Sequence, residues 1–160
     1  MAEAKNFACP SCAASLTIRA LEHTVAVACG HCGSVLDAKD PNLRVLSQYR
    51  ERFIQPQIPL GTRGTFLATA YEAVGFLRRK VTVEGMDYSW SEYLLFNPFK
   101  GFRWLMEYHG HWTLLRTATP SPGGILSPVS KTFEGQTFKH FQTARAQVTY
   151  VAGEFTWQVK

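Results

Sequence analysis

Hydrophobic and polar residues alternate through most of the chain after residue 60, in short runs separated by turn residues. The turns are Glu84-Gly85, Asn97-Pro98 with Gly101, and His109-Gly110. Connections this short join antiparallel neighbours. The pattern therefore predicts one antiparallel β domain over residues 60–118. Its strands are expected at 63–68, 71–83, 88–96, 102–108 and 111–117.

Apolar residues occupy both faces of several of these expected strands. A sheet that must bury two faces curls into a small barrel or packs as a sandwich. The predicted fold class is mainly β, with a small barrel or sandwich-like domain after a separate N-terminal unit.

The pattern breaks at residues 119–131, where Thr119-Pro120-Ser121-Pro122-Gly123-Gly124 is typical of a loop or linker. Residues 132–160 are interpreted as a β extension, the start of a second repeat that would continue past Lys160. Strands are expected at 131–141, 144–151 and 154–159, with a turn at Ala152-Gly153.

Residues 1–38 contain two short β-prone runs, at 15–19 and 24–28, which are expected to pair as a hairpin. Residues 39–59 are interpreted as a connector. Within it, residues 42–53 fit a short helix as well as a strand packed on the next domain.

The four cysteines of the chain form two Cys-x-x-Cys pairs, Cys9 with Cys12 and Cys29 with Cys32. This spacing is typical of a zinc ribbon, in which four thiolates hold one tetrahedral Zn²⁺. Four sulfur ligands leave no open position, so the zinc is expected to be structural and His31 to be solvated. Redox-active dithiols are the alternative, but the βαβ context that favours them is missing. Metal removal is expected to unfold residues 7–37 and to leave the β domain intact.

The composition of the chain excludes some classes of protein but does not indicate a function. The chain is 46% hydrophobic and 18% charged, which is typical of a globular protein and excludes general disorder. The formal net charge is +5. Zinc and its thiolates would lower it to about +3, a weak basis for nucleic-acid binding. The N-terminus lacks a signal-peptide pattern and no apolar run is long enough for a transmembrane helix. Reduced cysteines favour the cytoplasm, and peripheral membrane association stays open.

Glu107, His109 and His111 would share one face of an uninterrupted strand and could then hold a catalytic metal. Gly110 is expected to turn the chain, which sends His111 down the next strand to face Tyr108. These side chains are therefore interpreted as an exposed hairpin tip.

Glu92 is a lone charge in the apolar block Trp90-Ser91-Glu92-Tyr93-Leu94-Leu95. A buried carboxyl with a raised pKa could act as a general acid or base together with His109 or His111, which makes an enzyme one alternative. No nucleophile and base, or second paired carboxylate, accompanies it in the sequence. Glu92 is therefore expected to accept hydrogen bonds from backbone groups or an indole, or to pair with an arginine.

The aromatic residues and the run Arg78-Arg79-Lys80 support a second alternative, a nucleic-acid-binding protein that uses a basic strand edge and exposed aromatic rings. Core packing of the rings is the favoured interpretation. The candidate partner-binding residues are Trp90, Glu92, Trp104, His111 and Trp112.

The blocks at 60–64, 71–76, 90–95, 101–105 and 110–112 resemble a bacterial β-rich domain of unknown function that commonly follows a zinc ribbon. Trp-x-Glu-Tyr-Leu-Leu is the most specific block, and 153–157 resembles the start of that family's second half. The resemblance implies a non-catalytic cytosolic protein. We therefore expect a zinc-binding adaptor that recognises a protein partner through the knuckle residues Pro10, Ser11, Gly30 and His31.

Overall fold

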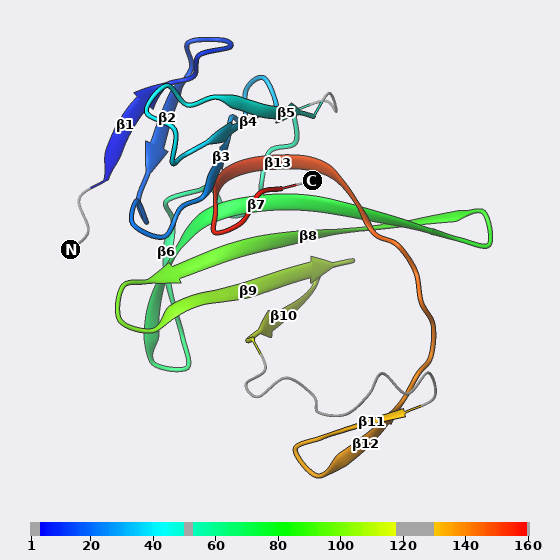
Figure 1. Ribbon diagram of the computed structural model, residues 1–160. Coiled ribbons are helices and arrows are strands. Elements are labelled where there is room, and N and C mark those ends of the chain that lie inside the picture. Colours follow the sequence, from blue (N-terminus) through cyan, green and yellow to red (C-terminus); the bar gives the residue numbers. More distant parts are fainter. Residues whose placement is uncertain (1–3, 50–52, 118–129, 160) are drawn as a thin grey trace.

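The computed structural model describes residues 4–49, 53–117 and 130–159 (Figure 1). Within these ranges the regular secondary structure consists of β-strands alone. The mainly β class is thus confirmed. The described residues contain no helix long and apolar enough to cross a membrane. The strands are β1 (Lys5–Ala8), β2 (Ser15–Ile18), β3 (Ala26–Ala28), β4 (Ser34–Asp37), β5 (Val45–Gln48), β6 (Arg63–Phe66), β7 (Thr69–Val83), β8 (Met86–Asn97), β9 (Gly101–Tyr108), β10 (His111–Leu115), β11 (Ser130–Phe133), β12 (Gln136–Lys139) and β13 (Gln147–Phe155).

Strands β6 to β10 form the predicted antiparallel meander, because each pairs with the next one along the chain. They belong to a nine-stranded sheet with the order β10-β9-β8-β7-β13-β3-β4-β5, in which β6 also pairs with β7. Among the described residues, β10 and β5 end this path and do not pair with each other. The sheet is therefore open, and the closure of a small barrel is not found.

Both faces of the sheet are buried where β7, β8 and β13 lie side by side, as the unbroken apolar run at 93–96 requires. Successive side chains alternate between the faces. One face is covered by the segment 54–66, in particular by Ile54, Ile58 and Leu60. Its buried residues are Tyr71, Ala73, Phe76, Tyr93, Leu95, Leu105, Tyr150 and Ala152.

The opposite face continues directly into the N-terminal region. Leu77 of β7 and Val151 of β13 pack in one cluster with Ala26, Ala28 and Val35 of β3 and β4. Trp104 and Trp157 pack against each other at the edge of this cluster, with tilted rings whose centroids are 5.2 Å apart. The N-terminal region and the later β domain therefore share one core as well as one sheet.

The expected hairpin between 15–19 and 24–28 does not form. Instead β2 pairs with β1, and β3 pairs with β4, so that each Cys-x-x-Cys pair lies in the turn of its own hairpin. Residues 5–8 form β1, which lies nearer to β2 along the chain than β3 does. β2 therefore pairs with β1 and not with β3. Strand β1, at 5–8, is not predicted by the sequence pattern.

The stretch predicted as a connector contains β5, which pairs with β4 in the N-terminal region. Residues 42–53 were compatible with a helix or with a strand on the following β domain. They contain a strand instead, and it pairs with the N-terminal region. β5 leaves Val45 exposed and half-buries Leu46.

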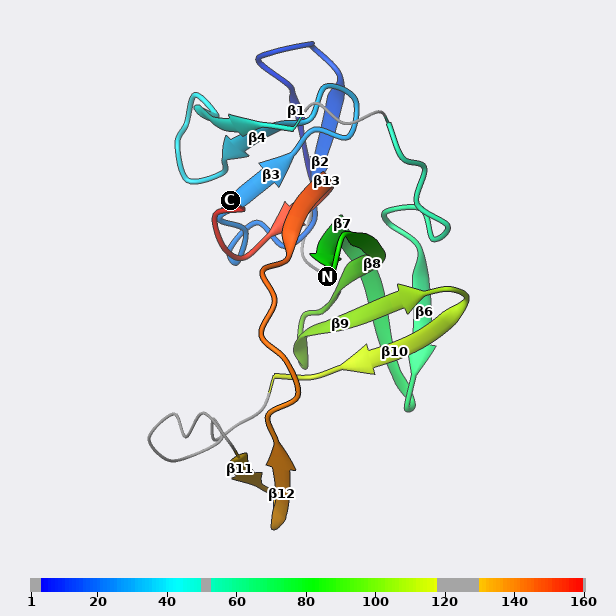
Figure 2. The same ribbon diagram turned by 90° about the vertical axis from the view of Figure 1, so that its right-hand side faces the viewer.

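The C-terminal pattern also differs from expectation. The run 131–141 is a hairpin, β11–β12, because Glu134 and Gly135 both adopt positive φ and reverse the chain. This hairpin lies away from the large sheet (Figure 2). Ala152-Gly153 is not a turn but the middle of the continuous strand β13. Of the predicted linker 119–131, all but the last two residues lie outside the described residues.

Candidate metal centre and its junction with the sheet

The four cysteine sulfurs lie close together, all within 4.8 Å of one another. Two of the Sγ–Sγ distances, Cys9 to Cys32 and Cys12 to Cys29, are 3.7 Å. A disulfide would need about 2.05 Å. A tetrahedron with metal–sulfur bonds of about 2.3 Å has edges of about 3.8 Å. The arrangement is therefore compatible with one ion held by four thiolates.

The two hairpin turns that carry the cysteines have the same backbone hydrogen bonds. In the first, the Cys9 amide donates to Ala14 and the Ala13 amide donates back to the Cys9 carbonyl, at 2.9 and 2.8 Å. In the second, the Cys29 amide donates to the Ser34 carbonyl and the Gly33 amide donates to the Cys29 carbonyl, at 2.8 Å each.

Ala13 and Gly33, at matching positions of these knuckles, both have positive φ, of 61° and 72°. Glycine is required only at the second, because a Cβ on Gly33 would overlap the Tyr49 carbonyl.

The thiols differ in how readily they ionise. Burial raises the pKa of Cys29 to about 12. Burial also opposes ionisation of Cys32, but hydrogen bonds with Ser34 and with the thiols of Cys12 and Cys29 together lower its pKa to about 6. A metal must therefore displace protons from some of the four sulfurs, so its affinity falls as the pH falls.

The part of the large sheet that follows residue 58 matches a known family. Residues 59–160 match the family model described as "Domain of unknown function (DUF4178)". The chain belongs to this family. No curated protein and no solved structure matches the chain. The DUF4178 domain therefore begins within the segment 54–66 that covers one face of the sheet, and it includes β6 to β13.

The last strand of the DUF4178 domain joins it to the metal-binding region, because β13 pairs with β7 on one side and with β3 on the other. Gly153 stands opposite both Ala28 and Gly75. A Cβ on Gly153 would overlap the Val74 carbonyl oxygen and lie 2.7 Å from Cδ1 of Leu60. The close approach of β7 and Leu60 to β13 thus depends on glycine at this position.

Glu154 is the most deeply buried acidic residue among those described, with 1% of its surface exposed, and sequence reasoning did not select it. The carboxylate accepts hydrogen bonds from the backbone amides of Arg19 and Ala20, at 2.7 and 2.8 Å. The Thr24 hydroxyl lies 2.9 Å from the carboxylate and 2.8 Å from the Ala20 carbonyl. Glu154 therefore fastens the loop after β2 to the DUF4178 sheet. The available signal was a single charge flanked by Gly153 and Phe155.

Burial raises the pKa of Glu154 above its usual value of 4.5, although its hydrogen bonds oppose the rise. A protonated Glu154 can donate to Thr24 while Thr24 donates to Ala20. Because the folded state holds this proton more tightly than the unfolded state, its contribution to stability is complete below pH 4.5. That contribution is lost as the pH rises through the folded pKa.

We expect Glu154→Gln to lower the free energy of unfolding by about 1–3 kcal/mol, because its NH₂ group would face a backbone N–H. The difference from wild type should shrink as the pH rises from 5 to 7.5, since only the wild type loses the proton. Urea unfolding in saturating zinc, monitored by tryptophan fluorescence, measures the free-energy difference and its change with pH. Both proteins keep the same cysteines, so thiol ionisation cancels. A difference that widens with pH would show that the pKa is lowered instead.

Four of the five predicted partner-binding residues lie on one face of the sheet, namely Trp90, Glu92, Trp104 and His111, whereas Trp112 lies on the other. Glu92 accepts hydrogen bonds from the Trp90 indole at 2.6 Å and from Arg79 at 3.2 Å. This is the indole and arginine pairing expected for it. Trp104 packs on the shared core, whereas Trp112 is 42% exposed and lies beside Tyr93, with ring centroids 5.8 Å apart.

The hairpin tip at His109-Gly110 forms as predicted, with His111 opposite Tyr108. Both histidines are exposed, and the Glu107 carboxylate accepts a hydrogen bond from the Gly110 amide at 2.8 Å. The chain reversal therefore separates the groups that a straight strand would have aligned.

The basic run 78–80 does not lie on a strand edge, because β13 and β8 flank it on both sides. Arg79 pairs with Glu92, and Lys80 pairs with Asp87 at 3.0 Å. Two of the three charges are thus compensated locally, which weakens the observation that suggested nucleic-acid binding.

Proposed function

We propose that this protein is a non-catalytic zinc-binding interaction protein whose metal-binding ribbon, β1 to β5, presents a partner-binding surface fixed on the DUF4178 sheet. One observation carries the proposal. Four cysteine sulfurs converge on one point, while the side chains between them in the knuckles, Pro10, Ser11 and His31, are exposed. The site suits a structural ion, and its surroundings suit recognition.

Zinc is the proposed metal because four thiolates in a tetrahedron are its usual structural ligands, and the site leaves no position for substrate or water. The ligands must stay reduced, which favours the cytoplasm. The rigid knuckles also lower the entropy lost when a partner binds. Glu92 supports a non-catalytic role, since both of its carboxylate oxygens are engaged by Trp90 and Arg79.

The metal part of the proposal is tested by elemental analysis of protein purified in reducing buffer without added metal. One zinc per chain is expected, and none in Cys29→Ser. Iron in place of zinc, or an intramolecular disulfide, would contradict it.

The interaction part is tested by placing a photo-crosslinking amino acid at position 11 in cells that produce the protein. We expect a discrete protein adduct at position 11 that disappears when Cys29→Ser is added. The same amino acid at Thr82, an exposed position on the distant β7–β8 hairpin, should give none. An adduct that does not depend on the metal site, or none at position 11, would refute a knuckle-mediated interaction.

A further inference from the structure

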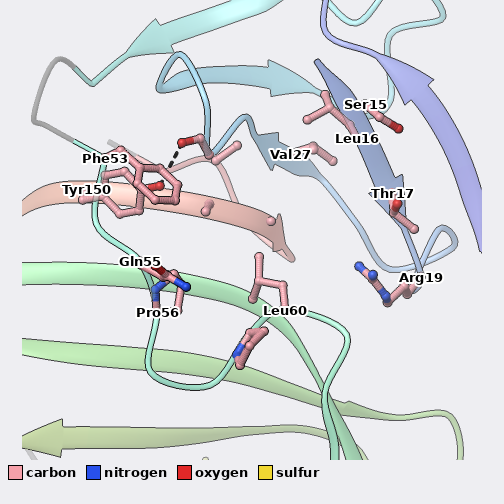
Figure 3. A pocket seen from close by; sticks show the side chains of 15 residues that line it. Ser15, Leu16, Thr17, Arg19, Val27, Phe53, Gln55, Pro56, Leu60 and Tyr150 are labelled. Atoms are coloured by element: carbon pink, nitrogen blue, oxygen red, sulfur yellow. Dashed lines mark hydrogen bonds between the residues drawn. The ribbon is translucent and has the colours of Figure 1, made fainter.

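A cleft of about 330 Å³ lies between the ribbon and the DUF4178 domain (Figure 3). Strand β2 lines one side and the segment 53–60 lines the other, with residues of β3 and β13 between them. The walls include Leu16, Val27 and Leu60, which are apolar, and the hydroxyl-bearing Thr17 and Tyr150. The volume is at the lower end of the range for binding pockets, about 300–1,000 Å³.

The side of the cleft formed by β2 is an unpaired strand edge. The bond from Cys9 to Ala14 marks a hydrogen-bonded pair of the β1–β2 ladder, so the next such pair contains Leu16. The backbone groups of the alternate residues, Ser15 and Thr17, then point away from β1. Among the described residues β2 pairs with β1 alone, so this edge has no strand partner.

Arg19 shows which way the edge faces. It is two residues beyond Thr17, so its amide has the same direction, and it donates to the Glu154 carboxylate across the junction. The end of the edge is thus satisfied by Glu154, whereas Ser15 and Thr17 lie in the cleft wall. Unpaired strand amides and carbonyls bind the backbone of another extended chain.

We propose that this cleft binds an extended peptide segment of a partner protein, which adds a strand to β2 through the backbones of Ser15 and Thr17. The inference rests on the proposed interaction function and gives it a site. The apolar walls suit an uncharged aliphatic side chain that points inward. Arg19 offers no free charge, because its Nε is 2.8 Å from Glu72.

Both cysteine knuckles are connected to the lining of the cleft. β2 begins three residues after Cys12, and Gly30, in the second knuckle, also lines the cleft. The Gly30 carbonyl accepts a hydrogen bond of 2.9 Å from the Tyr150 hydroxyl on β13. Peptide binding should therefore depend on the metal, although the peptide does not touch it.

The test begins with a displayed library of random heptapeptides selected on the zinc-loaded full chain. The strongest binder is then synthesised with each backbone amide methylated in turn. Strand addition predicts a period of two: alternate methylations weaken binding at least tenfold, and the intervening ones change it less than twofold. In ¹⁵N NMR spectra the amide signals of Ser15 and Thr17 should shift on titration.

Two proline variants give a matched comparison. Thr17→Pro removes the outward amide of the cleft edge, and Asn6→Pro removes the outward amide of the opposite edge of the same hairpin. Both lose the same side-chain hydrogen bond, since Thr17 donates to Asn6 at 2.9 Å. We expect at least tenfold weaker binding for Thr17→Pro and less than twofold change for Asn6→Pro. If Thr17→Pro does not fold, the methylated peptides still decide the question.

Several outcomes would overturn the inference. They are a library without binders, methylation effects without a period of two, and shifts at Ser11 and His31 in place of Ser15 and Thr17. A concentration-dependent dimer that protects Ser15 and Thr17 without peptide would assign the cleft to a second copy. None of these results alters zinc content or metal-dependent crosslinking at position 11, so failure here is distinguishable from failure of the proposed function.

Discussion

Replacing Cys29 by serine is expected to unfold the ribbon and also to loosen the centre of the DUF4178 sheet. Structural zinc sites contribute roughly 10–16 kcal/mol of apparent binding free energy, as much as the whole stability of a typical domain. Without the metal, the short hairpins of β1 to β4 bury too little surface to stay folded. β13 then loses its pairing with β3, and Glu154 loses its partners at Arg19 and Ala20.

Hydrogen exchange of the zinc-loaded protein and of Cys29→Ser measures this effect. Amides of β3 and β4 should lose nearly all protection, and those of β13 and of residues 75–80 in β7 should exchange at least tenfold faster. His31→Ala is the matched control, because it changes an exposed residue of the same knuckle and keeps all ligands. Full protection of β13 in Cys29→Ser would show that the DUF4178 domain is independent, as the sequence had suggested.

A single methyl group at Gly153 is expected to destabilise the junction by about 3–5 kcal/mol. The Cβ of Gly153→Ala would overlap the Val74 carbonyl and press on Leu60, and the φ of 83° is unfavourable for alanine. Two of the three nearest atoms, the Val74 carbonyl oxygen and the Gly75 Cα, belong to the backbone of β7, so moving the Leu60 side chain alone cannot relieve the clash. Urea unfolding gives the change in free energy.

Gly85→Ala separates the two causes. Gly85 has nearly the same φ, 80°, but nothing lies within 4 Å of its added Cβ, so only the backbone strain of about 1 kcal/mol remains. Equal losses in the two variants would mean that φ alone explains the requirement for glycine at 153, and that the strands do not need their close approach.

Local features of this chain could be predicted because their causes are local. The two-residue turn at His109-Gly110 sets the register of its hairpin, and the Cys-x-x-Cys spacing brings sulfurs together whatever follows. The engagement of Glu92 by Trp90 followed in the same way, since a lone charge in an apolar strand needs a nearby donor.

Long-range pairing could not be predicted, because strand patterns do not specify partners. The alternation of apolar and polar residues in 147–155 does not show whether the strand ends in a turn at 152–153 or continues. The strand continues because it pairs with β7 on one side and with β3 on the other. Glycine at 153 resembled a turn signal for this reason, although its role is to let the β7 backbone and Leu60 approach β13. The function of Glu154 depends on the same distant contact, with residues 130 or more positions away.

The position of β13 also determines when the protein can finish folding. The ribbon and the β6–β10 meander leave the ribosome first, but the edges of β3 and β7 stay open until Gln147–Phe155 has been synthesised. Open strand edges are sites of aggregation and of pairing with other chains. A nascent chain of this protein therefore exposes both edges from the completion of β7 at Val83 until β13 has been made, and one strand closes both at once.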